Sequence, residues 1–223
     1  MEMRNHNAGT TRRNFLKTTA ATAAVGATSS LWLPSSAKAA PAQGGHLRVG
    51  LAHGATADSL DPGLLENGFE WAITFAAFNN LTEIAPDGSL VGELAESWEP
   101  NADASAWTFN IRKGVQFHDG QELTADDVIA SLNYHRGEGN SSGVGPLIGD
   151  ITGITAPDAN TVQITLGSGN VDFAAILAGQ GFLIKKASDG KIDPLDPNGT
   201  GAFRINLSNV GSETARLSRS SSF

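Results

Sequence analysis

The sequence has no cysteine among its 223 residues. Disulfides, thiolate metal sites and cysteine-based redox chemistry are therefore excluded. A lipid anchor attached to a cysteine is excluded for the same reason. Because the absence of cysteine does not fix a compartment, the location of the protein has to be argued from other features.

The N-terminal region lacks a strongly apolar run of about 20 residues, the length that crosses a bilayer. Its most apolar stretch, residues 18–33, consists mainly of Ala, Thr and Gly, and it follows Arg12, Arg13, Phe15 and Leu16. This order is typical of a twin-arginine export signal rather than of a membrane anchor. We predict a signal peptide over residues 1–39, export through the twin-arginine translocase and a periplasmic location.

Small residues follow the apolar stretch and resemble a signal-peptidase site. Ala37 and Ala39 flank Lys38, so the mature chain is expected to begin near Ala40. A disordered tail rich in Ala and Ser is the alternative interpretation.

Positive charge is scarce after the signal. Five of the 15 basic residues and one of the 23 acidic residues lie in the first 39 positions, so the net charge of −8 becomes −12 for the remainder. Such an acidic chain repels phosphate backbones, and no basic stripe is interleaved with aromatic residues. Nucleic acid is therefore excluded as a partner.

Apolar periodicity indicates a mixed α/β domain. Thr124 with Asp127 forms a variant of the helix capping box, and Pro86-Asp87-Gly88 predicts a tight, hairpin-like turn. A polar, Gly-rich loop is expected over residues 137–145, and an unfolded tail over residues 207–223. The remaining predicted elements are strands at 46–51, 107–111 and 162–166, and helices at 68–80, 124–136 and 171–179.

Several segments resemble, in order along the chain, the family 5 extracellular solute-binding proteins. These segments are LDP at 60–62, GELAESWE at 92–99, WTFNIRKGVQFHDG at 107–120, LTADDV at 123–128 and GTGAF at 199–203. Members of this family serve ABC importers for dipeptides, oligopeptides and nickel complexes. The chain is thus identified as a member over residues 40–204.

The resemblance implies an α/β fold: an incomplete clamp like that of the periplasmic binding proteins, class II and of the peptide-binding type. The first lobe would carry an inserted subdomain. It also implies capture of peptides or similar small solutes for the ABC permease subunits in the membrane, with no cofactor and no enzymatic activity. A metal-complex binding protein and a nonfunctional truncated remnant are the alternatives.

The segment 205–223 departs from the family pattern and is interpreted as an aberrant, disordered tail. We expect a frameshift or a premature end of the gene, and we expect this chain to bind solute weakly or not at all. The first expectation rests on this tail, which is rich in Ser and Arg and matches nothing in the family. The second rests on length, because family members are more than twice as long and half a clamp cannot close.

Ligand contacts are expected in the loop after the first strand and at the start of the next helix. His53, Asn67 and Trp71 are the candidates, with packing or solvent exposure as the alternative role for each. The four aromatic residues at strand spacing are predicted to pack in the core; they are Trp98, Trp107, Phe109 and Phe117.

Other chemistry-bearing patterns receive structural interpretations. His118 and Asp119 precede Gly120 and indicate a turn rather than a base or a metal site. Residues 139–143 fit G-x-S-x-G around Ser141, but they follow a helix, have no evident histidine partner and suggest a linker. The five histidines are too scattered to form a metal triad.

Overall fold

The computed structural model describes residues 44–52, 54–137, 139, 141–206 and 215–220. The chain divides into two units, Met1–Arg48 and Val49–Phe223, and the first is described only at residues 44–48. The strand predicted at 46–51 is absent, and Leu47, Val49 and Leu51 are exposed. A strand requires a partner, and no described strand pairs with these residues.

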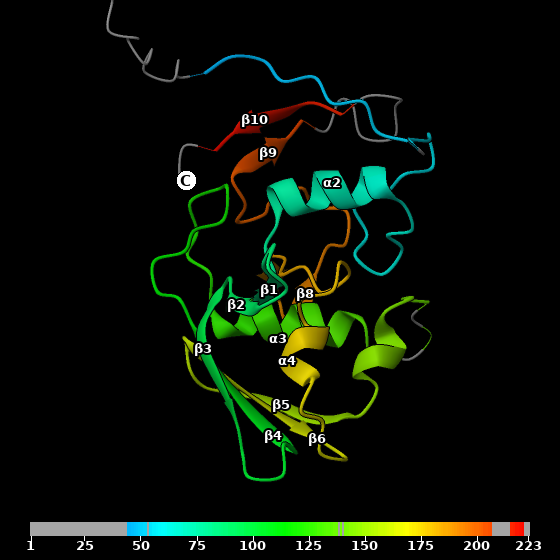
Figure 1. Ribbon diagram of the computed structural model, residues 1–223. Coiled ribbons are helices and arrows are strands. Elements are labelled where there is room, and N and C mark those ends of the chain that lie inside the picture. Colours follow the sequence, from blue (N-terminus) through cyan, green and yellow to red (C-terminus); the bar gives the residue numbers. More distant parts are fainter. Residues whose placement is uncertain (1–43, 53, 138, 140, 207–214, 221–223) are drawn as a thin grey trace, which may run out of the picture. The chain divides into compact units, whose positions relative to one another are not determined.

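The second unit contains a four-stranded antiparallel sheet in the order β3-β4-β6-β5 (Figure 1). Its central strands alternate between buried and partly exposed or exposed residues, as the pattern in the sequence predicts. Trp107 and Phe109 on β4 stack at 6.2 Å in the core, which confirms their predicted packing role. The strands are β3 (Ala95–Pro100), β4 (Ala106–Ile111), β5 (Ile151–Asp158) and β6 (Thr161–Leu166).

Helix α3 (Ala125–Tyr134) packs against this sheet through Val128 and Leu132. One carboxylate oxygen of Asp127 accepts hydrogen bonds from the Thr124 N–H, at 2.8 Å, and from the Thr124 hydroxyl, at 2.9 Å. The predicted helix and its cap are therefore confirmed. The other carboxylate oxygen accepts the Ala187 N–H at 2.8 Å, so this cap also holds a distant segment.

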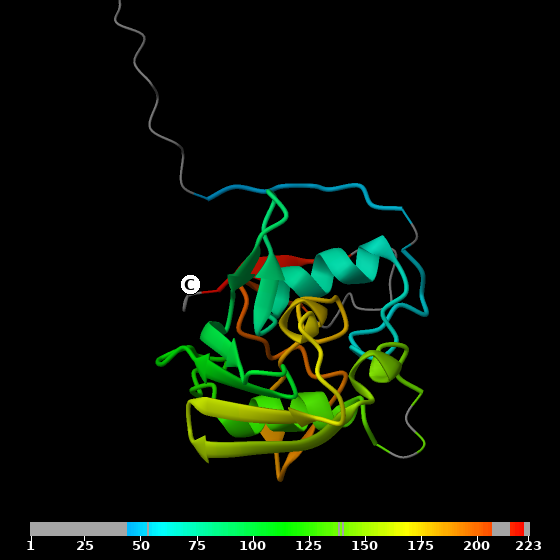
Figure 2. The ribbon, with the colours of Figure 1, turned by 60° about the horizontal axis from the view of Figure 1, so that its bottom comes forward.

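A second, smaller core is formed around helix α2 (Gly68–Ala77) and strand β9 (Phe203–Ile205), which pairs with β10 (Leu217–Arg219). Figures 1 and 2 show these elements from two directions. The buried residues of this core are Leu60, Ile73, Ala77, Phe78, Leu183 and Ile205. Helix α2 confirms the prediction over residues 68–80, with an end three residues earlier. The expectation of an unfolded tail is wrong for residues 217–219, because these form a strand.

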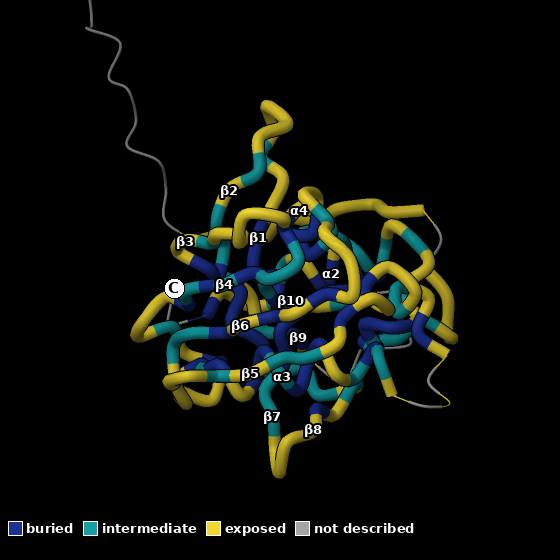
Figure 3. The backbone as a smooth tube through the Cα atoms, turned by 90° about the horizontal axis from the view of Figure 1, so that it is seen from below, coloured by how far each residue is buried: buried dark blue, intermediate teal, exposed yellow. Residues whose placement is uncertain are grey.

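The remaining elements are short. The predicted turn joins β1 (Thr82–Ile84) to β2 (Leu90–Gly92), and its tip at residues 86–89 is exposed (Figure 3). The predicted short helix is α4 (Phe173–Ile176). The others are the 3-10 helix η1 (Gly145–Ile148) and strands β7 (Ala187–Ser188) and β8 (Lys191–Ile192). Among the described residues, no helix has the length and apolar character needed to cross a membrane.

Candidate functional site

The loop that precedes α2 is fastened to the first turn of that helix. The Asn67 side-chain oxygen accepts the N–H groups of Phe69 and Glu70, at 2.9 and 3.1 Å. Its amide nitrogen donates to the Asp58 carboxylate at 3.0 Å. Asn67, one of the predicted ligand contacts, thus caps the helix and ties it to the loop.

Glu70 completes this cap and was not singled out from the sequence. It is buried, and its carboxylate accepts the N–H groups of Ser59, Glu66 and Asn67 at 3.0, 2.8 and 3.3 Å. The spacing Asn67-x-x-Glu70 is the sequence signal of a capping box and could have identified it. The loop is consequently fixed by polar contacts, although it contains no regular structure.

Trp71 lies one residue further along α2 and is partly exposed. Its indole N–H lies 3.5 Å from the Leu65 carbonyl oxygen, a long contact that holds the ring loosely. Leu64 and Phe75 are 45% and 48% exposed, so apolar surface remains open on this helix and the loop before it. His53 lies outside the described residues, as do Arg12, Arg13, Phe15, Leu16, Ala37 and Ala39.

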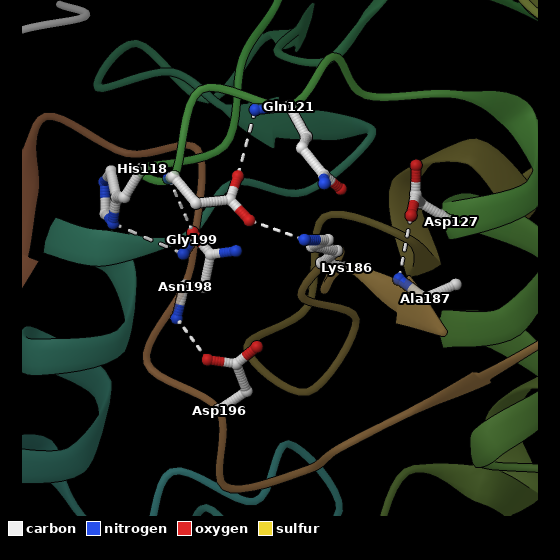
Figure 4. Close-up of polar contacts among 9 residues, drawn as sticks. His118, Gln121, Asp127, Lys186, Ala187, Asp196, Asn198 and Gly199 are labelled. Atoms are coloured by element: carbon white, nitrogen blue, oxygen red, sulfur yellow. Dashed lines mark hydrogen bonds and ion pairs between the residues drawn. The ribbon is translucent and has the colours of Figure 1, made fainter. Parts of the chain in front are cut away.

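The His118-Asp119-Gly120 turn joins the Gly199-Thr200-Gly201 segment (Figure 4). His118 is buried, and both of its ring nitrogens are used: Nε2 lies 2.8 Å from the Gly201 carbonyl oxygen, and Nδ1 accepts the Gly199 N–H at 3.3 Å. The His118 N–H also donates to the Gly199 carbonyl at 2.8 Å. The structural interpretation of this histidine is therefore confirmed.

Asp119 adds an ion pair to the same contact. Its carboxylate lies 2.5 Å from Lys186 Nζ, and its N–H donates to the Asn198 side chain at 3.1 Å. Figure 4 shows Lys186, the residue before β7, and Asn198, from the segment before β9, beside the turn that contains His118. Both side chains of the ion pair are partly exposed, so it contributes little to stability.

The two glycines of this segment pack against the end of α2. A Cβ atom on Gly199 would lie 2.0 Å from the Ala77 carbonyl oxygen, and one on Gly201 would lie 2.6 Å from the Ala77 carbonyl carbon. Between them, the Thr200 hydroxyl donates to the Asn79 side chain at 2.8 Å. Only glycine permits this approach of one backbone to another.

Glu93, in the GELAESWE segment, contacts the residues that follow α2, one of which binds Thr200. Its carboxylate accepts the Asn80 N–H at 2.7 Å and is hydrogen-bonded by the Asn79 side chain. Burial raises the pKa of Glu93, while these two hydrogen bonds oppose the shift. Residues 79–80, 93, 118–119 and 198–201 form one connected contact region, which we call the motif junction.

A hollow of about 410 Å³ opens beside the motif junction, between the start of α3 and the β7–β8 hairpin. Its acidic residues outnumber its basic one, Lys186. Within the described residues, no three His, Asp or Glu side chains are grouped closely enough to hold a metal ion. The acidic residues of the hollow are Glu122, Asp126, Asp127 and Asp189.

A second hollow, of about 510 Å³, contains a pair that sequence reasoning missed: the Ser142 hydroxyl lies 2.7 Å from His135 Nδ1. This serine is adjacent to Ser141, for which no histidine partner was evident. Burial lowers the pKa of His135 to about 4, which makes the ring a weak base at neutral pH. The nearby N–H groups of Gly143 and Gly145 donate to carbonyls, so they are not available to an oxyanion.

Lys185 is a buried cation in the smaller core. Its Nζ atom donates to the Asp196 carbonyl at 2.7 Å, lies 3.5 Å from the Leu60 carbonyl, and stands 4.2 Å from the centre of the Phe78 ring. Burial lowers its pKa to about 8, against the attraction of nearby carboxylates. Its position links the LDP segment to the segment before β9.

Comparison with known proteins identifies two regions. A family model described as bacterial extracellular solute-binding proteins, family 5 middle, matches residues 89–222. A second, for the twin-arginine translocation signal sequence, matches residues 9–29. The chain therefore carries a twin-arginine signal, which directs it to the periplasm. The first match includes most of the segment that was expected to depart from the family.

Two of the similar individual proteins are peptide-binding proteins of the periplasm. The dipeptide-binding protein of Escherichia coli is 31% identical over 180 residues, which cover 66% of this chain and 33% of the relative. The periplasmic binding protein DppA of Helicobacter pylori, solved with the peptide STSA, is 27% identical with a TM-score of 0.64 and covers 76% of this chain and 38% of its own. The chain thus spans about a third of the length of these relatives.

A third similarity concerns the fold alone. NikZ of Campylobacter jejuni, solved with Ni(L-His), is 22% identical with a TM-score of 0.64, and the match covers 74% of this chain and 34% of the other. The predicted fold class is confirmed: the described residues adopt part of a periplasmic binding protein of the peptide and nickel type.

Proposed function

The chain belongs to the bacterial extracellular solute-binding proteins of family 5, and from this premise we propose that it serves an ABC importer as its substrate-binding component. In this role it contributes to the capture of peptides or similar small solutes in the periplasm and to their delivery to the permease. The observation that carries the proposal is the family match over residues 89–222. The named ligand of the Helicobacter pylori neighbour, a peptide, supports the solute class.

The motif junction supports the proposal in a specific way. The sequence segments shared with the family contact one another there through buried groups, among them His118 and Thr200. We infer that they hold the four-stranded sheet against the smaller core. These segments therefore contribute to the scaffold, and we look for solute contacts among other residues.

Trp71 is our preferred solute contact among the three candidates. Its ring is partly exposed and weakly held, and exposed apolar side chains lie before and after it. The Asn67 side chain is engaged in capping, so its contribution is to position α2, with one amide N–H left to donate. We keep His53 as a candidate, because it is five positions before Asp58 in the sequence.

We propose no catalytic role for this chain. The two peptide-binding proteins described above are transport proteins, and the Ser142–His135 pair has a weak base and engaged neighbouring N–H groups. The pair instead joins the end of α3 to the loop before η1.

A hybrid protein tests the proposed function in cells. The segment of the Escherichia coli dipeptide-binding protein that matches this chain is replaced by residues 46–206, and the hybrid is produced in a strain that depends on dipeptide uptake. We expect growth on dipeptides to be retained with the parent hybrid and reduced by Trp71→Ala. A folded, exported hybrid that gives no growth would contradict the proposal. The exposed substitution Val171→Ala is the matched control.

A further inference from the structure

The strand β10 occupies an edge of β9 with which no other strand of the described residues pairs. The pairing is antiparallel, with Leu217 opposite Ile205 and Arg219 opposite Phe203. It is extended at both ends, because the Asn206 N–H donates to the Arg216 carbonyl at 2.9 Å and the Ser220 N–H donates to the Ala202 carbonyl at 2.8 Å. The ladder thus runs from residue 202 to residue 206 on β9.

The same segment covers the smaller core. Ala215 and Leu217 pack against its buried cluster, beside Ile205, which is 8% exposed. Ser220 is only 3% exposed, although its segment is rich in Ser and Arg. Successive side chains of a strand point to opposite faces, so Leu217 and Arg219 share one face of β10 and Ser218 lies on the other.

Without β10, two kinds of surface would be exposed. The backbone N–H and C=O groups along this edge of β9 would have no strand partner, and the apolar cluster around Ile205 would lose the cover of Ala215 and Leu217. Such an edge pairs readily with strands of other molecules. We propose that residues 215–220 act as a built-in strand that closes this edge of β9 and covers the smaller core, and so prevents other chains from pairing with β9 along this edge. This inference goes beyond the proposed function, since it concerns only the folded state of this chain.

The absence of native cysteine allows a direct test of this closure. The hydrogen bonds at 202–220 and 206–216 place Phe203 and Arg219 in a pair without mutual hydrogen bonds, with Cα atoms about 4.5 Å apart. This separation is within the range for a disulfide. In the full chain, Phe203→Cys with Arg219→Cys is expected to oxidise within one molecule and to leave no free thiol.

The control shifts one cysteine by a single residue. Phe203→Cys with Ser218→Cys places the thiols on opposite faces of the hairpin, so both should stay reactive. Equal oxidation of the two variants would overturn the proposal, as would a disulfide-linked dimer of the first, because β10 would then pair with another molecule. A first variant that keeps both thiols free would overturn it too.

A matched pair of substitutions tests the consequence. Leu217→Asp places a charge against the smaller core, whereas Leu195→Asp does so at a side chain that is 57% exposed. We expect the first to lower the thermal midpoint of the full chain by about 5 °C and to cause concentration-dependent association in light scattering. The second should change neither property. Equal midpoints, or a Leu217→Asp chain that does not associate, would overturn the proposal.

Discussion

His118 Nε2 lies 2.8 Å from the carbonyl oxygen of Gly201, although 83 residues separate the two in the chain. With the Nδ1 contact to Gly199, this bond joins two segments that the sequence presents as separate motifs. The buried ring therefore acts as a bridge between the turn before α3 and the segment before β9. Its chemistry is structural, since both nitrogens are occupied by backbone groups.

The first prediction concerns this bridge. His118→Ala leaves the Gly201 carbonyl without its donor and opens a cavity, so the free energy of unfolding should fall by about 2–4 kcal/mol. Urea denaturation followed by tryptophan fluorescence measures the change. His46→Ala, at an exposed histidine, is the control and should have no measurable effect. Equal stability of the two variants would contradict the bridging role.

The second prediction concerns the close approach of Gly201 to α2. Gly201→Ala places a Cβ atom 2.6 Å from the Ala77 carbonyl carbon, and backbone has to move. We expect a loss of about 1–3 kcal/mol in the free energy of unfolding. Gly153→Ala on β5 is the control, because nothing lies within 4 Å of the position that its new Cβ atom would take. If Gly201→Ala is as stable as the control, the contact with α2 is not tight.

The third prediction concerns acid. The pKa of His135 is lowered to about 4 in the folded chain from an ordinary value of 6.5, and burial is the main cause. The unfolded chain therefore binds a proton first as the pH falls, so His135 makes the free energy of unfolding decrease from pH 6.5 to about 4.

Denaturation of the parent and of His135→Gln across this range measures the effect. In His135→Gln the free energy of unfolding should depend less steeply on pH, whereas His46→Gln should show the same dependence as the parent. Because Glu93 titrates in both proteins, only the difference between the two curves is assigned to His135. Parallel curves would show that the histidine is not buried in its neutral form.

The fourth prediction concerns alkaline conditions. Burial lowers the pKa of Lys185 to about 8 in the folded chain from 10.5. Between these values the unfolded chain binds the proton more tightly, so the free energy of unfolding should rise as the pH increases from about 8 to 10.5. Lys185→Met should abolish this rise, and Lys191→Met, at an exposed residue, should preserve it. A rise that survives in Lys185→Met would assign it to another group.

Much of the fold is predictable because its strands and helices carry periodic apolar residues. The central strands β4 and β6 and the helix α3 follow this rule, and Thr124 with Asp127 marks the start of α3. The prediction of a strand at 46–51 is wrong. Alternating apolar residues show that a segment could form a strand, but they do not show that a neighbouring strand is there to pair with it. The strand β10 was missed for the opposite reason: it has a partner and almost no pattern.

The contacts of the motif junction could not be predicted, because they join backbone groups far apart in the chain. No local pattern indicates that the Asp127 carboxylate binds the Ala187 N–H, or that His118 binds Gly201. Ser142 and His135 are seven residues apart in the sequence, and whether they meet depends on the path of the loop between them. The predicted solute contacts, by comparison, were placed by analogy, and Asn67 and Trp71 remain proposals.

Calorimetric titration with dipeptides tests the central claim most directly, that this chain forms part of a solute-binding protein. The purified hybrid with residues 46–206 in the Escherichia coli dipeptide-binding protein is titrated beside its Trp71→Ala and Val171→Ala forms. We predict saturable binding that Trp71→Ala weakens by about tenfold, or about 1.4 kcal/mol, and that Val171→Ala leaves unchanged. A folded hybrid that binds no dipeptide would contradict the claim.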